Sequence, residues 1–276
     1  MADLKTPKLL TNDQVSDYER NGCVFPIRIM SGEQALDLRR RFEALEEAIG
    51  GEAQSRFRIK AHLPFPWLHD LIRNAIMLDA VEDLIGPNIL CWGSSFFAKR
   101  AKDPRFVSWH QDSTYYGLQP PETATAWVAF NDSTIESGCV RFIPGTQRQG
   151  ILKHEETWDR NNLLVRGQRI NAVDDSKAVD IILRAGEISI HHEAVIHGSN
   201  PNCSNNARIG LSIHYIAPHV RQTAFEGASA LLVRGRDTHG YWEMEPTPEC
   251  DFDPGCLEEM DRRFAQYKSG VGKLHS

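Results

Sequence analysis

Hydrophobic positions in the first part of the chain recur with a helical period. The tetrapeptides TNDQ (residues 11–14) and SGEQ (31–34) are capping boxes, which open a helix by satisfying its first free backbone N–H groups. They predict helices that end at about Asn21 and at Gly50–Gly51. A third helical pattern, LHDLIRNAIMLDAVEDLIGP, predicts one further helix that stops at Gly86–Pro87.

Beyond residue 88 the pattern changes to short β-favouring segments separated by turn residues. These segments are ILCWGSSFFAKR, RFVSWHQD, TATAWVAFND, CVRFIPGT, EISIHH and ARIGLSIHYIAP. Many short strands with few helices between them are typical of an antiparallel barrel or a double-sheet jelly roll. We therefore predict a mainly β fold with flanking α-helices.

The pattern divides a single predicted domain, residues 1–276, into parts. Residues 10–86 form a helical N-terminal part, and residues 88–220 form the jelly-roll core. Residues 145–180, rich in charge, Asn and Gln, interrupt the core as a lid-like insertion, because long loops in compact domains are often functional. Residues 221–276 form a C-terminal extension, in which DPGCLEEMDRRFAQYKSG predicts a last surface helix.

Composition narrows the possible partners. Of the 276 residues, 41% are hydrophobic and 25% are charged, as in a soluble globular protein. The formal net charge of −6 provides no basic surface for a nucleic acid. The N-terminus MADLKTPKLLTNDQ lacks signal-peptide character and no apolar run could span a membrane, so we predict a cytoplasmic protein. The six cysteines form no CxxC pair, which predicts reduced thiols, and the sequence does not indicate an oligomeric state.

Candidate metal ligands occur in the segment SWHQDSTYYGL, residues 108–118. Side chains two residues apart in a strand point to the same face, so His110 and Asp112 would project side by side while Gln111 points away. That geometry suits two ligands of one metal ion. A His-x-Asp pair also arises often on ordinary strands, so the interpretation needs support from elsewhere in the chain.

The support comes from residues 191–216. His197 precedes a turn-rich segment, and Arg208 opens an alternating strand in which it shares one face with Ser212 and His214. An arginine that points into a barrel beside small residues leaves room for a ligand, and its planar fork matches a carboxylate. A salt bridge is the alternative explanation of this arginine. Two histidines and one carboxylate leave three positions of an octahedral ion open, as in non-haem Fe(II) oxygenases.

These landmarks together resemble the phytanoyl-CoA dioxygenase (PhyH) branch of the Fe(II)/2-oxoglutarate dioxygenases. Within that branch, the sequence is similar to the bacterial small-molecule hydroxylases. The resemblance covers roughly residues 10–225. It rests on HQD at 110–112, His197 about 85 residues later, Arg208 eleven residues after that, GCVRFIPGT (138–146) and HGSNPN (197–202). It implies a cupin-like double-stranded β-helix that uses Fe(II), with 2-oxoglutarate and O2 as cosubstrates.

The resemblance also implies residue roles. His110, Asp112 and His197 would bind iron, and Arg208 would pair with the distal carboxylate of 2-oxoglutarate. Because Asp112 keeps the carboxylate that halogenating relatives replace by a small residue, hydroxylation or desaturation is implied rather than chlorination.

Three further residues match positions around the cosubstrate. Ser199 would offer a hydroxyl to the distal carboxylate, Trp127 would wall the pocket, and Lys99 would face the cosubstrate. The structural alternatives are a turn cap for Ser199, core packing for Trp127 and a solvated charge for Lys99.

Five residues are candidates for the substrate pocket, and each could instead be structural. Gln111, Tyr115 and Tyr116 follow the first ligands, Arg141 lies on the CVRF strand, and His192 is near the distal ligand. Core packing is the alternative for the two tyrosines. The predominance of polar residues favours a small polar or anionic metabolite over a long acyl chain, and the resemblance makes 2-aminoethylphosphonate a candidate. We interpret the other imidazoles of this region as structural or surface residues: His191, His214, His219 and His239.

Other functions stay open on the sequence alone. The same scaffold could oxidise an acyl or natural-product intermediate. A zinc-dependent hydrolase could use the same three ligands with a bound water, but it would leave Arg208 without a purpose. A non-catalytic jelly-roll binding protein would not need three metal ligands to coincide.

Overall fold

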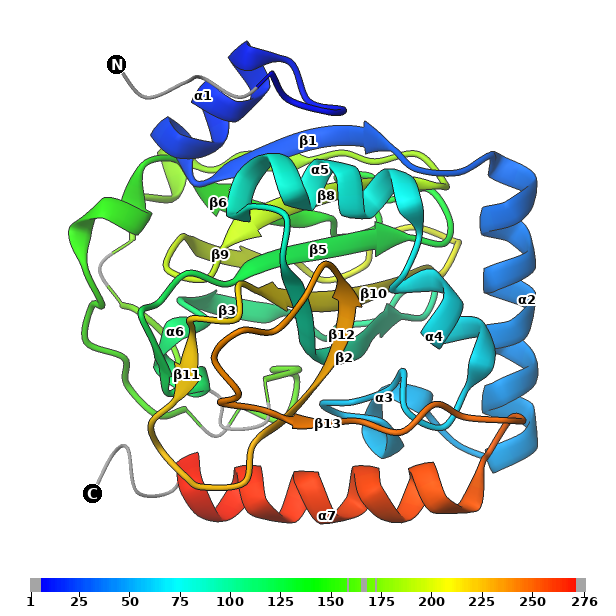
Figure 1. Cartoon of the computed structure of the whole chain (residues 1–276). Coiled ribbons are helices and arrows are strands. Elements are labelled where there is room, and N and C mark those ends of the chain that lie inside the picture. The colour runs from blue at the N-terminus through cyan, green and yellow to red at the C-terminus, as the bar shows by residue number, and fades with distance from the viewer. Residues whose placement is uncertain (1–5, 158, 165–167, 172, 272–276) are drawn as a thin grey trace, which may run out of the picture.

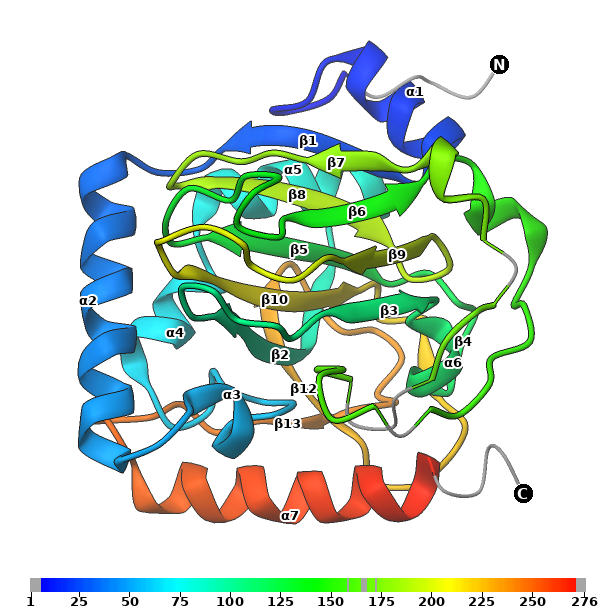
Figure 2. The same ribbon diagram turned by 180° about the vertical axis from the view of Figure 1, so that it is seen from behind.

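The computed structural model describes residues 6–271 except 158, 165–167 and 172. Two β-sheets face each other, and the helices lie around them (Figures 1 and 2). The strands are β1 (Cys23–Arg28), β2 (Ile89–Lys99), β3 (Val107–His110), β4 (Leu118–Gln119), β5 (Ala124–Ala129), β6 (Val140–Ile143), β7 (Val179–Ile181), β8 (Glu187–His192), β9 (Ile196–Ser199), β10 (Arg208–Ile216), β11 (Arg221–Gln222), β12 (Ser229–Arg234) and β13 (Glu243–Met244). The helices are α1 (Asn12–Asn21), α2 (Gly32–Ile49), α3 (Ala53–Arg56), α4 (Pro66–Leu71), α5 (Ala75–Ile85), α6 (Ser113–Tyr116) and α7 (Pro254–Val271), with 3-10 turns η1 (Thr146–Gln149) and η2 (Asp175–Lys177).

The larger sheet has the strand order β1-β8-β5-β10-β2-β12-β13, and the smaller one has the order β3-β9-β6-β7. Neighbouring strands are antiparallel except for β12 and β13. A short ribbon of β4 and β11 accompanies them. This arrangement confirms the predicted jelly roll, and Figure 2 shows the smaller sheet lying in front of the larger one.

The two faces of β10 explain why the sheets stack in this way. Its apolar side chains belong to the main core, together with residues of α2 and α5: Ile209, Leu211, Ile213 and Tyr215. Its other side chains line a cavity between the sheets: Arg208, Ser212 and His214. The alternation read from the sequence is therefore confirmed, because one face of β10 packs in the core and the other lines the cavity. Figure 1 shows α5 lying over the larger sheet.

The helices begin where their caps predict. Thr11 and Ser31 each accept a hydrogen bond from the third helical N–H, and both capping boxes are complete. The prediction of one long helix before Gly86 is wrong, because the chain breaks between α4 and α5. Asn74 causes this break: its side chain accepts a hydrogen bond from the N–H of Met77 and starts a new helix.

The predicted limits of the jelly-roll core are too narrow. β1 lies before residue 88 and pairs with β8 at one edge of the larger sheet, whereas β12 lies after residue 220 and pairs with β2. β1 carries a proline and only four regular pairs, which made its strand character hard to detect. The helical N-terminal part and the C-terminal extension therefore both contribute strands to the sheet.

Residues 145–180 contain η1, η2 and the start of β7, and are otherwise irregular where described. Their residues 158, 165–167 and 172 lie outside the described residues, and a lid motion stays a prediction. All six cysteines are unpaired, as predicted. No helix within the described part of the chain has the length and apolar character to cross a membrane.

Candidate metal and cosubstrate site

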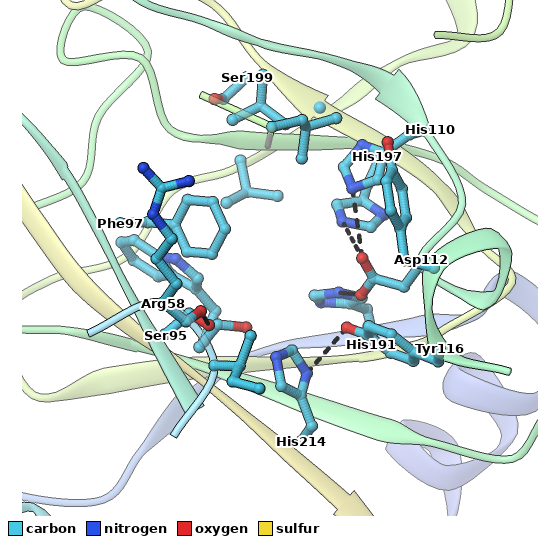
Figure 3. Close-up of a pocket in the computed structure, with 18 of the residues that line it drawn as sticks. Arg58, Ser95, Phe97, His110, Asp112, Tyr116, His191, His197, Ser199 and His214 are labelled. Atoms are coloured by element: carbon cyan, nitrogen blue, oxygen red, sulfur yellow. Dashed lines mark hydrogen bonds and ion pairs between the residues drawn. The ribbon is translucent and has the colours of Figure 1, made fainter. Parts of the chain in front are cut away.

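The smaller sheet brings the two predicted histidine ligands together. His110 in β3 lies directly opposite His197 in β9, and their ring centroids are 4.2 Å apart. The prediction that Asp112 shares a strand with His110 is wrong, because β3 ends at His110 and Asp112 occupies the N-cap position of α6. The Asp112 side chain makes no capping hydrogen bond, so its carboxylate is free to turn toward the histidines (Figure 3).

The geometry of these three residues fits a metal ion. Asp112 Oδ1 lies 3.3 Å from His110 Nε2 and 3.8 Å from His197 Nε2. Adjacent ligands of an octahedral ion with bonds of about 2.1 Å are about 3 Å apart. The three form the one cluster of at least three potential ligands found among the described residues.

Backbone contacts select the nitrogen that each imidazole presents. His110 Nδ1 lies 2.9 Å from the carbonyl oxygen of Ser108, and His197 Nδ1 lies 3.1 Å from that of Val195. Each Nδ1–H therefore donates to a carbonyl, and each Nε2 lone pair faces the cluster. This tautomer is the one needed for coordination through Nε2.

Electrostatics keeps the ligands in their coordinating forms. Burial lowers the pKa of His197 well below its usual value, and neighbouring His110 adds to this effect, so His197 stays neutral. Burial alone would raise the pKa of Asp112, but His197, His110 and His191 hold that pKa well below its usual value. A neutral imidazole and an ionised carboxylate are the forms that bind a divalent cation.

Arg208 lines the same cavity and is the clearest sign of a second ligand there. Its side chain is only 1% exposed, and its Nε and Nη2 have no hydrogen-bond partner among the described residues. Burial lowers its pKa to about 10, which leaves it charged at neutral pH. The alternative of a salt bridge is not supported, since no carboxylate of the described chain pairs with Arg208. A buried, unpaired guanidinium calls for an anion.

Trp127 and Gly210 shape the wall beside Arg208. The Arg208 guanidinium lies 5.1 Å over the centroid of the Trp127 ring, within range of a cation–π contact. A Cβ atom at Gly210 would come within 2.1 Å of that ring, so only glycine lets the indole lie across β10. Trp127 thus lines the cavity at its predicted position.

Ser199 and Lys99 complete this end of the site. Ser199 lines the cavity, and its Oγ accepts a hydrogen bond of 2.7 Å from Lys99 Nζ. Lys99 itself is fully buried and is not among the residues that line the cavity, and its contact with the cosubstrate stays a prediction. Burial, followed by the nearby charge of Arg208, lowers the pKa of Lys99 to about 6. Lys99 therefore contacts the cavity wall through its hydrogen bond to Ser199.

The cavity has a volume of about 320 Å³, within the range of small-molecule sites. The metal cluster lies on one wall, Ser199 on a second, and His214 at the far end (Figure 3). Aromatic side chains make up much of its lining, including Trp92, Phe97 and Tyr115. Figure 3 also shows Tyr116 beside His214, where its hydroxyl lies 3.1 Å from His214 Nδ1.

Two of the five predicted substrate residues, Tyr115 and Tyr116, line this cavity. The other three do not. The Gln111 amide donates to the carbonyls of Gly150 and Ala194, which ties two loops together. Arg141 forms ion pairs at 3.1 Å with Asp175 and with Asp180, away from the cavity.

The sequence predicts His192 as a pocket residue and His191 as a structural one, but the structure shows the reverse placement. His192 lies outside the cavity, where its Nδ1 accepts a hydrogen bond from the N–H of Ala194. His191 lines the cavity, with its Nε2 3.6 Å from Asp112 Oδ2. The alternation of β8 carries the signal that was missed, because His192 shares its parity with the core residue Ile190.

Other cavity residues also escaped the sequence interpretation. His214 is not merely structural, because it lines the cavity at its far end. Arg58, which follows α3, and a set of residues from α7 form further lining: Phe264, Tyr267 and Lys268. Tyr267 donates to the carbonyl of Tyr115 at 3.1 Å and so joins α7 to the turn after the metal ligands. His219 and His239 stay outside the cavity, as expected.

Two histidines and a carboxylate on a jelly roll are the ligand set of the non-haem iron oxygenase class. Comparison with known sequences makes the assignment more specific. The sequence model of the phytanoyl-CoA dioxygenase (PhyH) family matches residues 18–210. The chain belongs to this family of Fe(II)- and 2-oxoglutarate-dependent oxygenases, as the sequence resemblance predicted.

Individual relatives agree with this assignment. A phytanoyl-CoA dioxygenase domain-containing protein 1 homolog of Dictyostelium discoideum is 34% identical over 128 residues, 45% of each chain. A probable alpha-ketoglutarate-dependent hypophosphite dioxygenase of Stutzerimonas stutzeri is 26% identical over 183 residues, 64% of each chain. The chain thus spans between about half and two thirds of these curated relatives. The solved non-heme monooxygenase ThoJ is 33% identical, with a TM-score of 0.82 over 95% of this chain and 98% of its own.

Proposed function

We propose that this protein is an Fe(II)- and 2-oxoglutarate-dependent oxygenase that hydroxylates a carbon of a small polar metabolite. With iron and 2-oxoglutarate bound, the site would supply the reaction of R–H, 2-oxoglutarate and O2 to R–OH, succinate and CO2. Family membership and the three-ligand cluster support the reaction class. A cytoplasmic location stays a prediction.

The observation that carries the proposal is the unpaired Arg208 in the cavity of the metal cluster. His110, Asp112 and His197 would hold the metal, and Arg208 would bind the far carboxylate of the cosubstrate, with Ser199 beside it and Trp127 as a wall. A zinc hydrolase would need the three ligands and a water but would leave this buried guanidinium unpaired, at a considerable cost in stability.

The size and lining of the cavity support a small substrate. Metal, cosubstrate and substrate would share about 320 Å³, so only a small molecule, or the reacting end of a larger one, fits beside the aromatic residues. The relative from Stutzerimonas stutzeri carries the name of a hypophosphite dioxygenase, which supports testing phosphorus compounds. An organophosphonate such as 2-aminoethylphosphonate is the first candidate.

The test is succinate formation by the iron-loaded protein in air with 2-oxoglutarate and a panel of small polar metabolites that includes 2-aminoethylphosphonate. We expect succinate and a hydroxylated product to rise together with one class of compound. His197→Ala should abolish iron binding and turnover, because it removes one of three ligands, while its circular dichroism stays that of the parent.

The matched control is His219→Ala, since His219 is an exposed histidine paired with Glu122 outside the cavity. It should retain full turnover. Parent-like turnover in His197→Ala would contradict the ligand assignment. Absence of succinate with every compound, with zinc instead of iron in the purified protein, would favour the hydrolase.

A further inference from the structure

Two arginines that lie two residues apart near α3 have different surroundings. Arg56 points outward and forms a two-pronged pair with Asp261 of α7, at 2.7 and 2.9 Å. Arg58 lines the cavity, and its Nε donates to the carbonyl of Ser55 at 2.9 Å. No ion pair or further hydrogen bond engages the guanidinium of Arg58 within the described part of the chain. Figure 3 shows its side chain extending past Phe97, across the cavity from the metal cluster.

The backbone around Arg58 is fixed against β2. Ser95 Oγ donates to the carbonyl of Arg58, and the N–H of Ser94 donates to the carbonyl of Ile59 at 2.8 Å. The N–H of Ala61 donates to Ser94 at 3.1 Å. Arg58 is half-buried on this anchored segment and lines the cavity, so its side chain extends from a fixed backbone rather than from a free loop.

The charges of the cavity do not balance without a further anion. Among the described residues that line it, Asp112 is the acid, and Arg58, Arg208 and Lys268 are the bases. A divalent metal ion and a doubly charged 2-oxoglutarate cancel each other, and Asp112 offsets one base. Two positive charges are left in a protein whose formal net charge is −6. Such a local excess attracts anions and concentrates them at the site.

We propose that the substrate carries an oxyanion group, a carboxylate, phosphonate or sulfonate, and that Arg58 binds it. This inference rests on the proposed function. The planar fork of Arg58 offers two parallel N–H groups to such a group, and Lys268 on α7 adds charge at the rim. With the anion held across the cavity from the metal cluster, the reacting carbon lies between the two, beside the aromatic wall. Arg58 is therefore a specificity-determining residue.

The experiment uses methylphosphonate as the probe and the full chain loaded with Co(II) and 2-oxoglutarate under argon. Paramagnetic relaxation of the ³¹P signal reports binding near the metal. We expect saturable binding by the parent protein and an increase of about tenfold or more in the half-saturating concentration for Arg58→Gln, because a charge-assisted contact is lost. Arg58→Lys should lie between them, since it keeps the charge and loses the fork.

Controls separate the possible outcomes. Arg56→Gln removes the neighbouring arginine that is already paired with Asp261, and it should bind methylphosphonate as the parent does. The neutral dimethyl ester of methylphosphonate should bind much more weakly to the parent. Equal binding by Arg58→Gln and the parent, equal binding of the ester, or no saturable binding of methylphosphonate would overturn the inference.

Affinities for Co(II) and 2-oxoglutarate are measured in the same variants. If the parent binds neither, the proposed function fails. If it binds both but not methylphosphonate, this inference alone fails. A matching loss of 2-oxoglutarate affinity in Arg58→Gln would assign Arg58 to the cosubstrate and would also overturn the inference.

Discussion

Two places with buried charged side chains, the cluster around Glu245 and the cavity around Arg208, differ in whether the charged groups have hydrogen-bond partners. In one, Glu245 accepts hydrogen bonds from Lys60 and from Ser229, and His62 Nε2 lies 2.8 Å from its second oxygen. His62 Nδ1 in turn contacts Ser94 Oγ at 2.8 Å. In the cavity, by contrast, Arg208 is equally buried and two of its nitrogens have no partner among the described residues.

The contrast separates structural from ligand-binding polar groups. Ser94, His62 and Glu245 are arranged like a catalytic triad, but all three are buried and none lines the cavity, so no substrate reaches them. Their hydrogen bonds instead fasten the segment that carries Arg58 to β2 and to the chain after β13. A buried charge without a partner, as at Arg208, marks a place for a ligand.

The largest effect on stability is expected in the cluster around Glu245. Glu245→Gln leaves the Lys60 ammonium buried without a counter-charge, which should cost about 3–5 kcal/mol of unfolding free energy. Urea denaturation followed by circular dichroism measures it. Glu43→Gln is the control, because its pair with Arg39 is exposed and should contribute below about 1 kcal/mol. A loss of similar size in both variants would remove the distinction between the clusters.

The same cluster predicts how stability depends on pH. Burial alone would raise the pKa of Glu245, but Lys60 and His62 lower it to about 2. Since this pKa lies below that of the unfolded chain, about 4.3, its contribution is present above pH ~5 and is lost as pH falls toward 2. Burial also lowers the pKa of His62, which removes further stability as pH falls below about 6.5.

Denaturation measured from pH 7 to pH 3 should therefore show stability falling on acidification, and the fall should be shallower in Glu245→Gln. The full difference amounts to about 3 kcal/mol, of which only part is lost by pH 3. Parallel curves for the two proteins would show that Glu245 does not titrate in the folded state as described.

A substitution of Arg208, which lacks partners, should change ligand affinity rather than the free energy of unfolding. Arg208→Gln should weaken 2-oxoglutarate binding by about 2–5 kcal/mol, because it truncates one partner of a buried charge pair. Its unfolding free energy without ligand should be unchanged or higher, since an unpaired buried cation is removed. Calorimetric titration and urea denaturation measure the two quantities. A large loss of stability with unchanged affinity would make Arg208 structural.

The smallest effect is expected at His191, which lines the cavity beside Asp112. Its imidazole faces Asp112 Oδ2 at 3.6 Å, on the oxygen that does not face His110 and His197. His191→Leu should weaken metal binding by about 10–100-fold, the usual range for residues that orient a ligand. His191→Gln should recover part of the affinity through its amide donor. Competition with a coloured chelator measures this, and unchanged affinity in His191→Leu would leave His191 with packing alone.

The metal cluster could be predicted from the sequence because several short landmarks occur together, although none of them is specific alone. HQD and the alternating strand after Arg208 are visible in a few residues, and the capping boxes fix α1 and α2 in the same way. His191 was within reach of the same reasoning, because the alternation of β8 places it with Ser189 on the cavity side. The break at Asn74 was missed because the apolar period continues across it.

Arg58 and the residues of α7 lay beyond such reasoning. They meet only because the chain before β2 and the chain after β13 return to the same end of the sheet, as Figure 1 shows. Arg56 and Arg58 look alike in the sequence, and their different roles depend on the position of Asp261, about 200 residues away. No local period encodes a contact of that kind.

The position of α7 has a consequence for how new activities could arise in this lineage. The family match ends at residue 210, and α7 begins at Pro254, yet Phe264, Tyr267 and Lys268 line the cavity. Exchange of the segment that carries α7 would therefore replace the part of the cavity wall formed by these three residues, while His110, Asp112, His197 and Arg208 stay in place. A different α7 would present a different cavity to the same metal cluster.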